Sequence, residues 1–91
     1  MTISAQIAIV GYGPVGALLG NLLGARGITC VVIEKQPKPY PLPRAVHFDA
    51  EAMRVFQSVG LADEIKRDTL VGKGMRFQDG DGNVLIDWPR N

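Results

Sequence analysis

Two short apolar runs lie near the start of the chain, separated by a segment with helical spacing. The first run, residues 6–10 (QIAIV), is rich in β-branched side chains, which is typical of a buried strand. Leucines then recur at helical spacing through residues 14–26, and Pro14 suits the first turn of a helix. The second run, residues 29–33 (TCVVI), predicts another buried strand, closed by Glu34. The pattern predicts two parallel strands joined by a right-handed helical crossover.

The middle of the chain combines a proline-rich loop with a second helical pattern. Prolines at positions 37, 39, 41 and 43 favour an extended path. Asp49 is a suitable N-cap for a helix over residues 50–59. Gly60 follows where a Schellman ending would place a glycine, as Gly27 does after the first helix. Residues 62–66 are expected to add a helical turn.

The last third of the chain predicts a β-hairpin. Residues 73–78 and 84–88 have strand patterns, and the Asp-Gly pairs between them are strong turn signals. No helix or strand then returns to the first sheet before Asn91. Because a parallel sheet needs cover on both faces, we expect the natural protein to continue beyond this residue.

Composition narrows the classes of protein that are possible. The chain has 91 residues, 46% of them hydrophobic and 21% charged, which is the balance of one small folded domain. A net charge of +1 gives no indication of a nucleic-acid partner. Cys30 is the single cysteine, so neither a disulfide framework nor a zinc cluster is expected, and a reducing, cytoplasmic setting is favoured. Residues 7–24 lack charge, but their glycines and the absence of a preceding Lys or Arg argue against a membrane segment.

The candidate chemistry lies in the sequence GYGPVG, residues 11–16, between the first strand and the first helix. Gly11 permits a tight turn, Gly13 allows a pyrophosphate to approach the backbone, and Gly16 allows close packing of the helix. The helix directs free N–H groups and a partial positive charge at the phosphates. Glu34, which lies 18 positions after Gly16, is suited to accept the hydroxyls of an adenosine ribose.

This fingerprint predicts binding of an ADP-containing dinucleotide, without separating FAD from NAD. A carboxylate at Glu34 would repel a 2′-phosphate, so NADP is disfavoured there. The alternative, in which the glycines serve only turns and packing, is weaker because the strands, the helix and the acid all agree.

The residues after Glu34 resemble the start of the class A FAD-dependent aromatic hydroxylases, a family of flavoprotein monooxygenases. The shared features are the fingerprint, the segment PRAVHFD at residues 43–49, the helix ending QSVGL at 57–61 and the strand GMRF at 74–77. Within the family, the chain is most similar to 3-(3-hydroxyphenyl)propionate hydroxylases. The resemblance covers nearly the whole chain, but only about the first fifth of such an enzyme.

The resemblance implies an α/β fold: a Rossmann-like βαβ FAD-binding unit followed by a helix and a β-hairpin, in an incomplete domain. Residues 1–91 would form the N-terminal part of an FAD/NAD(P)-binding domain, without the substrate domain. The resemblance also implies that NADH or NADPH reduces the FAD and that one oxygen atom of O₂ is transferred to a phenolic acid. Arg44 would reach the FAD phosphates and help to steer the nicotinamide cofactor, with Ala45 and Val46 near the flavin. The cofactor-binding residues expected are Gly11, Gly13, Pro14, Val15, Gly16, Glu34, Lys35, Arg44 and Ala45.

Other interpretations remain open at this point. An NAD-dependent dehydrogenase, a different FAD oxidoreductase or a non-catalytic truncated remnant would also carry the fingerprint. No residue is expected to act as an acid or base, and His47 is more readily a structural residue than a proton carrier. Asp79 and Asp81 begin with calcium-loop spacing, but Val84 occupies the position that needs glycine, so no metal site is expected.

Overall fold

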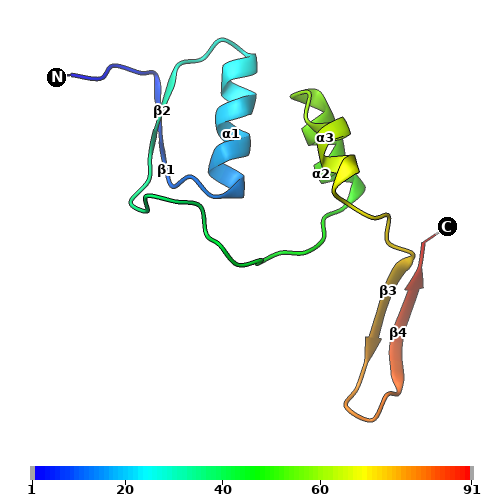
Figure 1. The fold of residues 1–91 in the computed structure, drawn as a ribbon. Coiled ribbons are helices and arrows are strands. Elements are labelled where there is room, and N and C mark those ends of the chain that lie inside the picture. The colour runs from blue at the N-terminus through cyan, green and yellow to red at the C-terminus, as the bar shows by residue number, and fades with distance from the viewer. Residues whose placement is uncertain (1, 91) are drawn as a thin grey trace.

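The computed structural model describes residues 2–90, which form seven elements along an extended path (Figure 1). In chain order these are β1 (Ile7–Val10), α1 (Pro14–Ala25), β2 (Cys30–Ile33), α2 (Ala50–Ser58), α3 (Ala62–Arg67), β3 (Gly74–Gln78) and β4 (Val84–Pro89). Each element predicted from the sequence is present, with its ends shifted by no more than a residue. The predicted fold class, a βαβ unit followed by helices and a hairpin, is confirmed.

The first three elements form the βαβ unit. β1 and β2 are parallel neighbours in register from the pair Ile7–Cys30 to the pair Val10–Ile33. α1 packs against both strands. At the start of the strands, the Gln6 N–H donates to Thr29 Oγ1 at 3.0 Å and the Thr29 N–H donates to Gln6 Oε1 at 3.0 Å. These paired bonds hold the two strand entrances side by side.

Both longer helices end as the sequence predicts. After α1, the Ile28 N–H donates to Leu23 O and the Gly27 N–H to Gly24 O, both at 3.0 Å. Gly27 has φ +70°, so the helix ends in a Schellman motif that uses a left-handed residue. The same two bonds recur after α2, where Gly60 has φ +79°.

α2 begins at a side-chain cap and packs with α3. Asp49 Oδ1 accepts the Ala52 N–H at 2.9 Å, as predicted for an N-cap. The ring of Phe48, just before the cap, meets Phe56 edge-on, with centroids 5.4 Å apart and planes at 81°. This aromatic pair fixes the angle at which the preceding loop enters α2.

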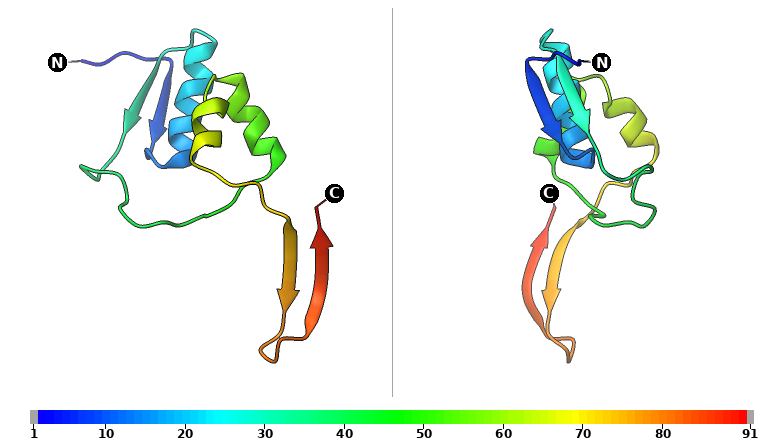
Figure 2. Two further views of the ribbon diagram at one scale, coloured as in Figure 1. Left: turned by 45° about the vertical axis from the view of Figure 1, so that its right-hand side comes forward. Right: turned by 90° about the vertical axis from the view of Figure 1, so that its left-hand side faces the viewer.

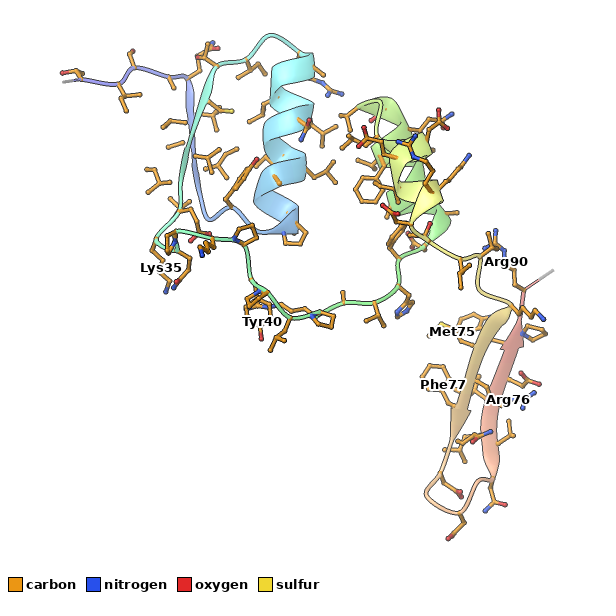
Figure 3. All side chains as sticks on the ribbon, viewed as in Figure 1. Lys35, Tyr40, Met75, Arg76, Phe77 and Arg90 are labelled. Carbon is orange, nitrogen blue, oxygen red and sulfur yellow. The ribbon has the colours of Figure 1, made fainter. Side chains whose placement is uncertain are left out.

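The hairpin of β3 and β4 extends away from the rest of the molecule (Figure 2). The strands are antiparallel, with Met75 opposite Trp88 and Phe77 opposite Ile86. Figure 3 shows Met75 and Phe77 on one side of β3 and Arg76 on the other. All four of the paired apolar residues are exposed, which leaves one apolar face of the hairpin uncovered.

The hairpin turn is organised by Asp79. Its Oδ1 accepts the N–H groups of Asp81 and Asn83, both at 2.9 Å, and its Oδ2 accepts the Asn83 amide at 3.0 Å. The side-chain and backbone bonds from Asn83 hold the pKa of Asp79 below its usual value. The carboxylate therefore serves the turn, in agreement with the interpretation from the sequence.

The expectation that both strands of the βαβ unit are buried is wrong for residues 2–90. Ile9, at 6% exposure, is the one buried hydrophobic residue among them, whereas Val10 is 84% exposed. β2, which includes Cys30, is half-buried over most of its length. The reason is geometric: α1 covers one face of the sheet, and no described element covers the other.

Candidate dinucleotide-binding site

The chain leaves β1 through a turn that depends on glycine. The Gly11 N–H donates to Ile33 O at 2.8 Å, which continues the ladder between β1 and β2 by one bond. Gly11 then takes φ +102°, a conformation that residues with a side chain rarely adopt. The backbone is thereby redirected from the strand to the first turn of α1.

Gly16 brings α1 against this turn. A Cβ atom at Gly16 would collide with Gly11 O, and it would lie 3.1 Å from the Gly11 carbonyl carbon and 3.4 Å from Ile9 Cγ2. The first of these contacts is with backbone, which cannot move aside as a flexible side chain can. The close packing expected of Gly16 from its place in the fingerprint is therefore present in the structure.

The N-terminus of α1 presents unpaired N–H groups. Gly13 is the N-cap and has no side chain to cap the helix, and Pro14 occupies the first helical position. The helix's first backbone bond runs from Ala17 N–H to Gly13 O at 2.9 Å, so Val15 and Gly16 have N–H groups with no acceptor in the helix. These donors and the helix dipole favour an anion here.

Space for such an anion lies in front of the turn. Nothing approaches within 4 Å of the position that a Cβ atom would take at Gly13. Beside this position, a shallow cleft of about 500 Å³ with a mainly apolar lining runs along the turn and the flank of β1. Its lining residues are Ala8, Ile9, Val10, Gly11, Gly13, Pro14, Val15, Gly16 and Leu19. The free N–H donors at the start of α1 and the open approach at Gly13 thus fit the pyrophosphate of a dinucleotide.

Glu34 lies at the end of β2 and contacts the glycine turn directly. Its Oε1 accepts the Tyr12 N–H and its Oε2 accepts the Gln36 N–H, both at 2.9 Å. The bond from Tyr12, followed by that from Gln36, holds the pKa of the Glu34 carboxyl below its ordinary value of 4.5. The side chain is therefore an anion at neutral pH, close to the donors of the turn.

The contact between Glu34 and Tyr12 was not predicted from the sequence. Spacing alone placed an acid near the ribose, but gave no reason to connect it to a backbone N–H of the turn. The signal was present in the topology, because parallel neighbouring strands end at the same edge of a sheet. Residues that follow β1 and β2 are therefore brought together there.

The remaining predicted residues lie on the loop between β2 and α2. This loop leaves the end of β2 and runs as an extended stretch to α2 (Figures 1 and 3). Within residues 2–90, no hydrogen bond joins Lys35, Arg44 or Ala45 to the glycine turn. Arg44 instead lies with its guanidinium carbon 4.1 Å from the centre of the Tyr40 ring. The structure thus brings Glu34 to the turn but leaves these three residues on an exposed loop.

No group of His, Cys, Asp and Glu side chains between residues 2 and 90 is arranged to hold a metal ion. His47 is exposed on the loop. Over the same residues, none of the helices is both long enough and apolar enough to span a membrane.

Comparison with known proteins gives a family match over most of the chain. A family model described as an FAD-binding domain matches residues 4–87. A 3-(3-hydroxy-phenyl)propionate/3-hydroxycinnamic acid hydroxylase of Paraburkholderia xenovorans is 48% identical over 84 residues, which is 92% of this chain. Enzymes with the same name from Burkholderia cenocepacia and Escherichia coli are 44% and 42% identical, over 90% and 96% of this chain.

The matched part of each relative is small. The chain spans 14% of the Paraburkholderia protein, 15% of the Burkholderia protein and 17% of the Escherichia coli protein. The similarity therefore bears on the dinucleotide-binding segment, and leaves most of each relative without a counterpart in the sequence given.

Proposed function

Because this chain belongs to the family of FAD-binding domains, we propose that it is the FAD-binding segment of a flavin-dependent monooxygenase. The complete enzyme uses NADH or NADPH and O₂ to hydroxylate a phenolic aromatic acid, of which 3-(3-hydroxyphenyl)propionate is the leading candidate. The carrying observation is the junction of the glycine turn, the open N-terminus of α1 and Glu34. The named activity of the hydroxylases similar to this chain supports the choice of substrate.

In the proposed site, the N-terminus of α1 and the Glu34 carboxylate bind different parts of FAD. The free N–H groups of Val15 and Gly16 bind pyrophosphate oxygens, with Gly13 leaving room for them. Glu34 accepts the ribose hydroxyls. Its oxygens each accept one backbone bond already, and a carboxylate has about four lone-pair positions, so acceptor capacity remains.

The rest of the site is supplied by the loop. We assign the FAD phosphates to Arg44 and a neighbouring position to Lys35, since both carry positive charge on the loop that follows β2, and Arg44 matches an arginine of the family motif. Ala45 lies next to Arg44 and is assigned to the side of the flavin. When bound, FAD supplies the electron transfer and oxygen chemistry, while this chain's residues hold and orient it.

The proposal predicts a yellow protein. The visible absorption spectrum of the complete gene product should show flavin, and the flavin released by denaturation should be FAD. Added 3-(3-hydroxyphenyl)propionate should then accelerate oxidation of NADH or NADPH, with one hydroxylated product formed per reduced nicotinamide consumed. The same acid without its ring hydroxyl is the matched control, and it should not yield hydroxylated product.

Each outcome distinguishes a different interpretation. A colourless protein that cannot be reconstituted with FAD would overturn the proposal and favour an NAD-dependent enzyme or a site that has lost its cofactor. Bound FAD without hydroxylated product would retain the FAD-binding segment but reject the aromatic substrate. Bound FAD with product would support the whole proposal.

A further inference from the structure

Tyr40 and Arg44 form a contact on the loop that the fingerprint does not explain. The guanidinium carbon of Arg44 lies 4.1 Å from the centre of the Tyr40 ring, within the distance at which a cation is attracted to an aromatic face. Both residues are exposed, and Tyr40 retains 56% of its accessible surface. The contact is therefore not a by-product of burial in a core.

The geometry of the loop accounts for this contact. In an extended chain, residues four positions apart are roughly 12 Å apart along the backbone. A bend at residues 41 and 42 returns the chain so that Arg44 lies over Tyr40. Pro41 and Pro43 lie between the two residues and fix their own φ angles, which reduces the number of other shapes the loop can take.

The charge of Arg44 is left available by this arrangement. The ion pairs within residues 2–90 are Arg54 with Glu51 and Arg76 with Asp87, so no described carboxylate neutralises Arg44. An aromatic ring attracts the cation without providing a lone-pair acceptor for its five N–H donors. Those donors remain free for a group that binds in a forked geometry, such as a phosphate.

We propose that Tyr40 is a positioning residue, which holds the Arg44 guanidinium ready to bind an FAD phosphate. This inference rests on the proposed function, and specifically on the assignment of Arg44 to the phosphates. Tyr40 itself need not contact the cofactor. Its effect is to restrict the side chain of Arg44 before FAD arrives, so that less conformational freedom is lost on binding.

The test measures FAD affinity by titrating the apoprotein of the complete enzyme and following flavin fluorescence. Tyr40→Leu, which removes the ring, should weaken FAD binding about two- to fivefold, the strength of an exposed cation–π contact. Tyr40→Phe retains the ring and should stay within about twofold of the parent protein. Arg44→Ala should weaken binding about tenfold or more, because a charged hydrogen bond is lost. Arg54→Ala removes a charge elsewhere and is the control.

A double variant separates positioning from any direct effect of Tyr40. In the Arg44→Ala background, Tyr40→Leu should cause no further loss of FAD affinity, because there is no guanidinium left to position. Equal losses from Tyr40→Phe and Tyr40→Leu, an additive double variant, or an unaffected Tyr40→Leu would each overturn the inference. If Arg44→Ala has no more effect than Arg54→Ala, the phosphate role of Arg44 fails first, independently of Tyr40.

Discussion

Replacement of Gly16 by alanine is the sharpest perturbation of the candidate site, because the new methyl group has no room. Its Cβ would collide with Gly11 O and lie 3.1 Å from the Gly11 carbonyl carbon. Relief requires α1 to move away from the turn or the turn to change shape. Overpacking of this kind costs about 1–3 kcal/mol. If the strain is expressed at the turn, FAD binding weakens by about five- to 150-fold.

The helix itself provides two matched controls for Gly16→Ala. Nothing lies within 4 Å of a Cβ built on Gly24, so Gly24→Ala should raise the free energy of unfolding by about 0.5–1 kcal/mol through helix propensity. A Cβ on Gly20 would lie 3.9 Å from Ile9 Cδ1, which is ordinary contact, so Gly20→Ala should be tolerated. All three substitutions add the same methyl group to the same helix.

The assay combines thermal unfolding of the complete protein with the dissociation constant for FAD. Gly16→Ala should lower both the unfolding temperature and the FAD affinity, whereas Gly24→Ala should lower neither. A Gly16→Ala protein with parental stability and parental flavin content would refute the inference that the turn and the helix are in tight contact. Equal losses in all three variants would show that the helix, and not the junction, is sensitive.

Three further predictions concern Gly13, Glu34 and the isolated chain. Gly13→Ala, whose Cβ meets nothing within 4 Å, should leave stability near the parental value but lower FAD content, and normal flavin content would contradict the placement of the pyrophosphate. Because the pKa of Glu34 is lowered from 4.5, its contribution to stability is complete above that value and is lost as pH falls through the lower folded-state value. In the complete protein, Glu34→Gln should therefore make stability depend less on pH below about 4.5 in an acid-unfolding experiment. An unchanged dependence on pH would argue against the Tyr12 contact. The isolated 91-residue chain should unfold without a sharp cooperative transition in a circular-dichroism melt, because Ile9 is the one buried hydrophobic residue among positions 2–90. A sharp transition would show that the exposed apolar faces need no cover.

Features set by neighbouring residues were predictable from the sequence. The Asp49 cap and the glycine endings of α1 and α2 each involve partners within five residues, so local chemistry determines them. The glycine turn was predictable for the same reason, with Gly11 and Gly16 five positions apart. The ends of α1 and α2 followed because Gly27 and Gly60 mark them in the sequence.

Features that depend on distant partners were not predictable in the same way. The Tyr12–Glu34 bond joins residues 22 positions apart, so no local pattern indicates it. The prediction that both strands are buried was wrong for a related reason. An apolar strand pattern indicates that a strand suits a covered sheet, but it does not indicate which segment covers it. Val10, apolar and 84% exposed, is the clearest case.

The two contacts of Glu34 change what its removal is expected to mean. From the sequence, loss of this carboxylate would cost a ribose contact and nothing else. In the structure its Oε1 also accepts the Tyr12 N–H, so the same side chain connects β2 to the turn that is proposed to bind the pyrophosphate. Truncation to alanine removes the hydrogen bonds that Glu34 accepts from Tyr12 and Gln36, as well as the proposed contact with the ribose. Under the proposed function, Glu34 couples ribose recognition to the shape of the turn, and its loss should weaken the pyrophosphate contacts as well as the adenosine end.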